Sequence, residues 1–311
     1  MDETGVDAPS FQALVDLVGG GDVMLLTGAG LSTESGIPDY RGPTGTARQV
    51  TPMTYQAFTR DAAARQRYWA RSHVGWHVID QALPNAGHRA VAELQSQGLL
   101  TGIVTQNVDG LHTSAGADDV LELHGALSRV VCLGCAALSS RGELADRMRE
   151  ANGDWSARAT GLNPDGDVEL PDEALQSFRV IDCRLCGGML KPDVVFFGET
   201  VPADRVESSF SFVARSRLLL VLGSSLQVMS GYRFVLRAAK LGVPVAIVNQ
   251  GQTRGDDHAG LRIDGPLGET LVRLTSAVTA YAAEGRTSPR RSSIRSPVTP
   301  ALTARRPRTN T

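Results

Sequence analysis

Four short apolar runs, each followed at once by a polar or glycine-bearing loop, constrain the fold of this chain more than any other feature. A continuous apolar run of this length is typical of a strand buried on both faces. Patterns of helical period lie between the runs, and this alternation predicts an α/β fold with a doubly wound, parallel, Rossmann-like sheet. The apolar runs are residues 23–26, 102–105, 218–222 and 243–248, and the helical patterns are residues 11–18, 86–97, 204–215 and 231–240.

The loops after the four runs leave the carboxyl ends of their strands, where open α/β sheets bind ligands. We therefore expect all four to converge on one cleft. In the first loop, Gly28 and Gly30 would let the backbone approach a pyrophosphate, and a helix starting there would favour the negative charge. The four loops are residues 28–32, 106–109, 223–225 and 249–251.

The glycine loop departs from the G-x-G-x-x-G fingerprint of dinucleotide-binding dehydrogenases. Thr33 stands where the third glycine belongs. No acidic residue ends an obvious second strand, where it would hold a ribose hydroxyl. These departures disfavour a nicotinamide-dependent dehydrogenase, which stays open as an alternative from a different class.

The four cysteines fall in two C-x-x-C pairs, Cys132 with Cys135 and Cys183 with Cys186. Two such pairs favour a tetrahedral four-cysteine zinc site. Disulfides or a redox motif are the alternatives, but a redox pair needs no second pair. Four thiolates leave no position for a catalytic water, so we expect one structural Zn²⁺.

Two segments interrupt the alternation of strands and helices. One has a helical pattern over residues 53–79 without a strand, and the other carries both cysteine pairs. Ser, Thr, Pro and Arg dominate the C-terminal residues, a composition typical of disorder. We therefore predict a Rossmann-like domain from residues 11–42, 86–125 and 193–283, a helical insertion at 43–85, a four-cysteine zinc module at 126–192 and a disordered basic tail at 284–311.

The charge distribution argues against a specific nucleic-acid ligand. The chain has 31 Lys and Arg against 33 Asp and Glu, but residues 286–311 hold seven Arg and no acid. The remainder is therefore acidic, whereas a nucleic-acid-binding domain carries a basic surface. A zinc-ribbon module that binds nucleic acid through the basic tail is thus a weaker alternative.

The sequence also predicts a cytoplasmic protein without a membrane span. No apolar run approaches eighteen residues. The first twenty residues contain four acids and no Lys or Arg, which does not fit a signal or transit peptide. The oligomeric state is not indicated.

A series of motifs in fixed order carries a family resemblance. The order of these motifs resembles that of the sirtuins, NAD-dependent protein lysine deacylases, over about residues 11–280. Residues 68–71, 155–157, 164–167 and 223–228 look most like class II, the mitochondrial lipoamidase-type sirtuins. The motif residues are 28–32, 36–42, 105–112, 123–125, the two C-x-x-C pairs, 191–199, 223–225 and 248–249.

The resemblance implies that NAD is consumed: the acyl group of an acyl-lysine passes to ADP-ribose and nicotinamide is released. It also implies that Asp39 and Arg41 lie on a mobile loop over the nicotinamide ribose, which Tyr40 shields. Asn107 would act at the ribose as a catalytic residue and Asp109 at the carboxamide. The full set of expected NAD-binding residues is Gly28, Ala29, Gly30, Ser32, Asp39, Tyr40, Arg41, Gln106, Asn107, Asp109, Gly223, Ser224, Ser225, Asn249, Gln250 and Gly251.

His124, between Leu123 and Gly125, is the expected catalytic base. Its position in the motif series supports that role, and a near-neutral imidazole suits abstraction of a ribose hydroxyl proton. Taken alone, it could equally be a core or turn histidine. His112 is the nearest competitor and is expected to pack or to hydrogen-bond locally. Solvated or helix-capping roles are expected for His73, His77, His88 and His258.

The partner implied by the resemblance is an acylated lysine of a protein. It would be held in an extended peptide between residues 197–199 and 223–228, which would pair with backbone groups. Val195 and Phe196 are candidates for lining the acyl-lysine tunnel, with core packing as the alternative.

The acyl preference stays open at this stage. Tyr68 and Arg71 lie three residues apart and share a helix face. Sirtuins that remove acidic acyl groups carry a similar Tyr-x-x-Arg pair, so Arg71 would favour a carboxylate-bearing chain. Alternatively, Arg71 is a surface residue. Plain deacetylation, lipoamidase-type activity and mono-ADP-ribosyl transfer remain possible outcomes of the same scaffold.

Overall fold

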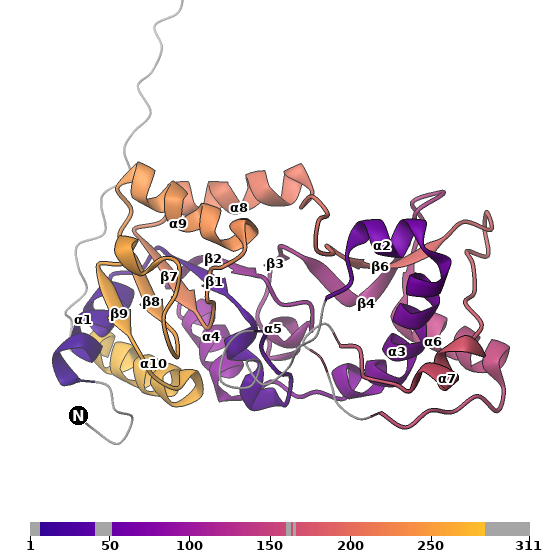
Figure 1. Cartoon of the computed structure of the whole chain (residues 1–311). Coiled ribbons are helices and arrows are strands. Elements are labelled where there is room, and N and C mark those ends of the chain that lie inside the picture. The colour runs from indigo at the N-terminus through magenta and orange to yellow at the C-terminus, as the bar shows by residue number, and fades with distance from the viewer. Residues whose placement is uncertain (1–6, 41–51, 160–162, 164–165, 284–311) are drawn as a thin grey trace, which may run out of the picture.

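A six-stranded, wholly parallel sheet forms the larger of two lobes in the computed structural model, which describes residues 7–40, 52–159, 163 and 166–283 (Figure 1). The predicted parallel α/β sheet is confirmed. Two short outer strands, β3 and β9, were not anticipated because three residues make no apolar run. In spatial order the strands are β3 (Val120–Glu122), β2 (Leu100–Thr105), β1 (Val23–Thr27), β7 (Leu218–Leu222), β8 (Val245–Val248) and β9 (Leu261–Ile263).

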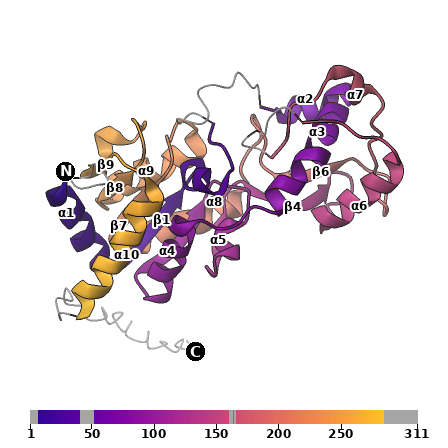
Figure 2. The same ribbon diagram turned by 90° about the horizontal axis from the view of Figure 1, so that it is seen from below.

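Helices cover both faces of this sheet, which is why its central strands are fully buried. Leu14, Leu94 and Leu271 fill the core on one side, and Val213 and Phe234 help to fill it on the other. Figure 2 shows the first set of helices side by side. That set is α1 (Ala8–Gly19), α4 (Ala86–Ser96) and α10 (Leu267–Ala283), and the second is α8 (Ala203–Arg215) and α9 (Met229–Leu241).

The helix expected directly after the glycine loop is absent, so that prediction was wrong. Two 3-10 turns stand there instead, Ala29–Leu31 and Thr33–Ser35. Gly36 adopts a left-handed conformation with φ of 84° and ends the second turn. Threonine and serine are poor helix formers, and the glycine provides an early stop.

A three-stranded antiparallel sheet organises the smaller lobe. The single helical stretch expected over residues 53–79 is two helices, because the side chain of Asp61 caps the second by accepting from the N–H groups of Ala63 and Ala64. The sheet order is β5 (Leu138–Ser140), β4 (Gly125–Cys132) and β6 (Leu190–Val194), and the helices are α2 (Tyr55–Arg60), α3 (Ala62–Asp80), α6 (Arg141–Asn152) and α7 (Asp172–Gln176), with α5 (Leu111–Ser114) in the larger lobe.

One hydrophobic core joins the two interrupting segments of the chain. Phe58 and Trp69 from the helical segment pack with Val130, Phe178 and Leu190 from the segment that carries the cysteines. The predicted helical insertion and zinc module therefore bury their apolar side chains against each other. The domain boundaries themselves stay a prediction, and the predicted tail lies outside the described residues.

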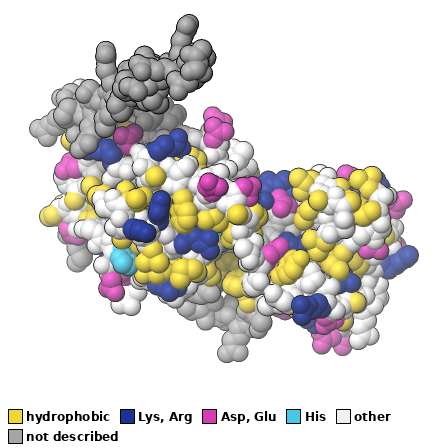
Figure 3. Space-filling model, turned by 90° about the horizontal axis from the view of Figure 1, so that it is seen from above, with side chains coloured by type: hydrophobic (Ala, Val, Ile, Leu, Met, Phe, Trp, Pro, Cys, Tyr) yellow, Lys and Arg dark blue, Asp and Glu magenta, His cyan; other side chains and the backbone are white. Residues whose placement is uncertain are grey.

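Among the described residues, no helix has the length and apolar character to cross a bilayer. On the face seen in Figure 3, basic, acidic and hydrophobic side chains are interspersed. That face therefore offers no uniformly basic surface.

Candidate functional site

A cavity of about 1110 Å³ opens where the order of the parallel strands reverses. After β1 the chain builds β2 and β3 on one side, and it later returns to place β7 on the other side of β1. The loops that leave neighbouring strands at such a point diverge, which creates the usual ligand crevice of an open α/β sheet. All four loops singled out from the sequence contribute to the cavity wall.

Close contact between two glycine loops forms the floor of this cavity. The N–H of Gly28 donates to the carbonyl of Leu222 at 3.0 Å, and the N–H of Gly30 donates to that of Gly223 at 2.9 Å. A Cβ at Gly30 would lie 2.9 Å from the Cα of Gly223, and one at Gly28 would lie 2.7 Å from the Cβ of Ser224. These glycines are therefore required for the two loops to touch, a reason distinct from the approach of a phosphate.

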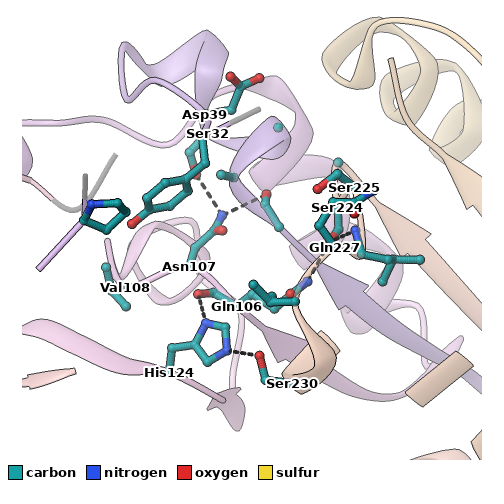
Figure 4. Close-up of a pocket in the computed structure, with 18 of the residues that line it drawn as sticks. Ser32, Asp39, Gln106, Asn107, Val108, His124, Ser224, Ser225, Gln227 and Ser230 are labelled. Atoms are coloured by element: carbon teal, nitrogen blue, oxygen red, sulfur yellow. Dashed lines mark hydrogen bonds between the residues drawn. The ribbon is translucent and has the colours of Figure 1, made fainter. Parts of the chain in front are cut away.

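A hydrogen-bonded group orients the polar side chains of the 106–109 loop. Asn107 Nδ2 donates to the carbonyl of Gly28 at 3.1 Å and to Ser32 Oγ at 3.0 Å, while Ser32 Oγ donates to Asp109 Oδ2 at 2.7 Å (Figure 4). The amide hydrogens of Asn107 are thus used within the protein, which leaves its oxygen to a ligand. Burial raises the pKa of Asp109, against the lowering effect of the Leu111 N–H and the Ser32 hydroxyl.

Two buried histidines support this group from below. His112 Nε2 lies 2.9 Å from Thr27 Oγ1, whose hydroxyl donates to Thr105 Oγ1, so Nε2 carries the proton. His88 Nε2 lies 3.5 Å from Ser32 Oγ, and His88 also completes the N-terminal capping box of α4. Burial lowers the pKa of His88 to about 3 and the pKa of His112 to about 4. Both rings are therefore neutral at neutral pH. His88 caps a helix as expected, but it is buried rather than solvated.

His124 is held from both ring nitrogens. Nδ1 lies 2.9 Å from the carbonyl oxygen of Gln106, and Nε2 lies 2.8 Å from Ser230 Oγ (Figure 4). A carbonyl can only accept, so Nδ1 carries the proton and Nε2 offers its lone pair. Burial lowers the pKa of His124, and the nearby Arg205 and Arg233 lower it further, while the Gln106 carbonyl raises it. The result is a neutral base.

The structure brings together most of the candidate ligand-binding residues. Arg41 lies outside the described residues, and Arg71 does not line the cavity. Sequence reasoning did not single out Ser230, which lines the cavity, because its partner, His124, lies far away in sequence. The predicted residues that line the cavity are Gly28, Ala29, Gly30, Ser32, Asp39, Tyr40, Tyr68, Gln106, Asn107, Asp109, His124, Val195, Phe196, Gly223, Ser224, Ser225, Asn249, Gln250 and Gly251.

Aromatic side chains build the end of the cavity that faces the smaller lobe. The rings of Tyr68 and Phe196 pack edge to face with their centroids 5.2 Å apart. Below them Lys191 Nζ lies 4.8 Å from the Phe196 ring centroid and 3.2 Å from Glu199 Oε2. Glu199 also accepts from the N–H of Phe196 at 2.9 Å. Buried Lys191 and half-buried Glu199, which sequence reasoning had not paired, thus fix the loop that carries Phe196.

Arg71 does not line the cavity and instead contacts the segment at residues 167–169. Its Nε donates to the carbonyl of Val168 at 2.7 Å and lies 3.3 Å from Asp167 Oδ2, and its Nη2 pairs with Glu169. The guanidinium therefore fastens α3 to residues 167–169. The geometry associates Arg71 with two carboxylates of the protein itself.

The four cysteines form a second centre, with all four sulfurs within 4.8 Å of one another. The Sγ atoms of Cys132 and Cys186 are 3.5 Å apart and those of Cys135 and Cys183 are 3.9 Å apart. These distances exclude disulfides, whose sulfurs are about 2 Å apart. They match the roughly 3.8 Å edge of a tetrahedron built on zinc–sulfur bonds.

The pKa values of two of these thiols shift in opposite directions. Backbone N–H groups of Cys135 and Gly134 lower the pKa of Cys132 to about 6. The Gly188 N–H lowers the pKa of Cys186, but the neighbouring sulfurs raise it to about 12. Four thiolates at this spacing repel one another unless a cation lies between them, and Zn²⁺ suits an all-sulfur set.

The β4–β6 ladder links this centre to the cavity. Cys132 pairs with Leu190 at one end and Gly125 pairs with Val194 at the other. His124 and Val195 continue the two strands into the cavity wall, and the Val195 N–H donates to the His124 carbonyl at 2.8 Å. The cysteine centre therefore holds together the two strands from which His124 and the Phe196 loop emerge.

Comparison with known proteins agrees with this arrangement. A family model described as the Sir2 family matches residues 28–230. The chain is 56% identical over 274 residues to "NAD-dependent protein deacetylase 1" of Streptomyces coelicolor, covering 87% of this chain and 92% of that protein. It is 49% identical over 252 residues to "NAD-dependent protein lipoamidase sirtuin-4, mitochondrial" of Homo sapiens, covering 80% of each.

Solved structures are similar over almost their whole length. One, "Structural Basis for the Mechanism and Regulation of Sir2 Enzymes", superposes with a TM-score of 0.71 at 28% identity and covers 88% of this chain and 99% of its own. Another, "Sir2-p53 peptide-NAD+", has a TM-score of 0.66 at 29% identity and covers 89% of this chain and 99% of its own.

Substituting one cysteine tests the metal centre. Cys186→Ser removes a thiolate, so we expect the protein to retain zinc more than about 10-fold less tightly and to unfold at a lower temperature. Zinc content after dialysis against a chelator measures the effect. Leu185→Ala is the matched control, because Leu185 is exposed between the same cysteines. Stoichiometric zinc in Cys186→Ser would contradict a four-cysteine site.

The buried histidines predict an acid-sensitive fold. An unfolded histidine binds a proton near pH 6.5, whereas folded His112 binds one only near pH 4. Between these values the unfolded chain holds more protons, so the free energy of unfolding falls as the pH drops, by about 1.4 kcal/mol per pH unit for each such ring. Urea titrations at pH 7.5 and pH 5 measure how far the free energy of unfolding falls between these pH values. This fall should be smaller for His112→Gln than for the wild type. His258→Gln, at an exposed position, should keep the wild-type drop, and an unchanged drop in His112→Gln would refute this account.

Proposed function

The chain belongs to the Sir2 family and is an NAD-dependent protein deacetylase, and from this premise we propose which of its residues carry out the reaction. The observation that supports the proposal is the convergence of four strand-end loops and a neutral, doubly held histidine on one cavity. NAD, when bound, supplies the ADP-ribose that accepts the acyl group, and nicotinamide is released.

NAD would lie along the floor made by the two glycine loops. We place the pyrophosphate over residues 28–30, where Gly28 and Gly30 carry no side chain that would hold a phosphate away from the backbone. The adenosine half would lie against residues 223–225 and 249–251. Asn249 shapes the second of these loops, because its Nδ2 donates to the carbonyls of Gln250 at 2.8 Å and Gly251 at 3.1 Å.

The nicotinamide half would lie toward Asn107 and Asp109. The free oxygen of the Asn107 amide can accept from a ribose hydroxyl, and Ser32 keeps the amide in that orientation. Asp109, whose pKa burial raises, suits a hydrogen bond with an uncharged carboxamide. We propose that Asp39 and Tyr40, which line the cavity, cover this end and exclude water.

His124 is the proposed general base. Its Nδ1 proton is committed to the Gln106 carbonyl, so its Nε2 can take a proton from a ribose hydroxyl. The proton then resides on Nε2 and the ring is an imidazolium. The ring becomes neutral again when this proton passes to solvent. This role requires a neutral ring in the resting enzyme, which the lowered pKa of His124 provides.

The acylated peptide would run as an extended strand between residues 197–199 and 223–228. Lys191 and Glu199 hold the first of these loops, and the N–H of Tyr55 donates to the Phe197 carbonyl at 2.9 Å. Backbone pairing of this kind supplies affinity with little sequence preference. A p53 peptide appears in the description of one related Sir2 structure.

The named relatives are deacetylases and a lipoamidase, so nothing favours the dehydrogenase alternative. We propose the bacterial cytoplasm as the location, because bacterial proteins are among the relatives and the cysteines form a reduced metal centre. Mono-ADP-ribosyl transfer stays a prediction without support from geometry.

The reaction can be tested with an acetylated peptide, NAD and mass spectrometry. We expect nicotinamide, deacetylated peptide and an acyl-ADP-ribose, with no absorbance from NADH. His124→Ala should lower kcat by about 10²- to 10⁴-fold, because the base is lost. The wild-type kcat/KM should hold down to pH 6.5 and fall only below it, because the pKa of His124 is lowered. His77→Ala, at an exposed position, is the control, and undiminished turnover in His124→Ala would refute the base assignment.

The acyl preference can be tested with acetyl, lipoyl, succinyl and methylglutaryl peptides. We propose that neutral acyl groups react at least about 10-fold faster, because Tyr68 and Phe196 line an apolar end and Arg71 is paired with Asp167 and Glu169. Arg71→Ala should leave the ratio of acetyl to succinyl rates unchanged. A wild-type preference for succinyl that disappears in Arg71→Ala would instead support the acidic-acyl prediction.

A further inference from the structure

Ser230, in the first turn of α9, makes the second hydrogen bond of His124. Its Oγ lies 2.8 Å from Nε2, the nitrogen whose lone pair must accept the ribose proton (Figure 4). Ser230 is half-buried and lines the cavity itself. The group that faces the reactive lone pair in the resting protein is therefore a side-chain hydroxyl.

The direction of this hydrogen bond follows from the other nitrogen. Because the Gln106 carbonyl fixes the proton of neutral His124 on Nδ1, the Ser230 hydroxyl must donate to Nε2. A ring held from one nitrogen can still swing about its side-chain torsion. Bonds on opposite sides of the ring fix both its plane and the direction of the lone pair.

The hydroxyl of Ser230 has no competing structural duty among the described contacts. Val228 is the N-cap residue of α9, and its side chain accepts no hydrogen bond from the helix. Ser230 Oγ does not take over this capping role, because its hydrogen bond is to His124. Serine at a helix start usually bonds to a backbone N–H. Here the hydroxyl turns across the cavity toward His124 instead.

Packing sets the position of Ser230 with respect to His124. The next residue, Gly231, lies directly against the Gln106 side chain, which occupies the space of a Cβ. Gln106 Nε2 in turn donates to Ser224 Oγ at 2.9 Å, in the loop that leads into α9. Gln106 therefore acts on both sides of His124. Its backbone carbonyl accepts from Nδ1, and its side chain packs against α9, the helix from which Ser230 reaches Nε2.

We propose that Ser230 is a positioning residue for the catalytic base, an inference that rests on the proposed role of His124. In the resting enzyme its hydroxyl donates to Nε2 and holds the lone pair in the cavity. Because Nε2 has one lone pair, the Ser230 O–H turns away as the ribose hydroxyl binds, and once that hydroxyl has given its proton to Nε2, Ser230 Oγ accepts from the new N–H. A hydroxyl can serve both protonation states, because it is a donor and an acceptor.

The test compares turnover with nicotinamide exchange in Ser230→Ala. In the proposed mechanism nicotinamide leaves before His124 takes the ribose proton. Incorporation of labelled nicotinamide into NAD therefore reports a step that does not need the base. We expect Ser230→Ala to lower kcat of deacetylation about 3- to 10-fold, with exchange and the KM for NAD within about twofold of wild type. Ser211→Ala is the matched control, because Ser211 is exposed on α8 and bonds only within its own helix.

Nitrogen-15 NMR of the imidazole supplies a readout independent of turnover. The wild type should show His124 as the Nδ1–H tautomer with a hydrogen-bonded Nε2, and Ser230→Ala should lose the hydrogen-bond shift at Nε2. An unchanged kcat, an unchanged Nε2 signal, or equal losses of exchange and turnover would overturn the positioning role. Wild-type protein that exchanges no nicotinamide and deacetylates no peptide would instead overturn the proposed function itself.

Discussion

Contact between two glycine loops is the constraint on which the site depends. Strands β1 and β7 are neighbours in the sheet although they lie far apart in sequence, and their loops touch through Gly28, Gly30 and Gly223. A side chain at any of these positions would separate the loops. With the loops together, the ends of the central strands form a continuous floor. The residues over that floor then come from four separate stretches of the chain.

Beneath that floor the polar groups are arranged by neutral partners rather than by charges. Two uncharged imidazoles, two threonine hydroxyls and Ser32 connect into the network that orients Asn107 and Asp109. Ion pairs would have carried a large desolvation penalty at this depth.

Local sequence pattern was sufficient for the parts of the molecule that local chemistry determines. Continuous apolar runs identified the central strands, and the spacing of Cys132, Cys135, Cys183 and Cys186 identified the metal centre. Local sequence pattern was insufficient where the partner of a side chain lies on another helix or strand. Arg71 has the spacing of a ligand-binding pair yet bonds to residues 167–169, and Ser230 meets His124 only because α9 packs on Gln106. The helix prediction after the glycine loop was wrong for a different reason. The glycine pattern implied a helix there, but Gly36 ends the second of two short 3-10 turns before a helix can form.

The β4–β6 ladder carries a consequence for the physiology of the enzyme. One end of the ladder is fastened by four sulfurs and the other end presents His124 and the Phe196 loop. A zinc ion held by four cysteines would have no open position for chemistry, and its effect would be to fasten β4 to the start of β6. The thiols of Cys135 and Cys186 are exposed, so oxidants would meet this structure at the end of the ladder opposite His124. Loss of those sulfurs would loosen the strands behind the catalytic base and leave the residues of the cavity chemically unchanged.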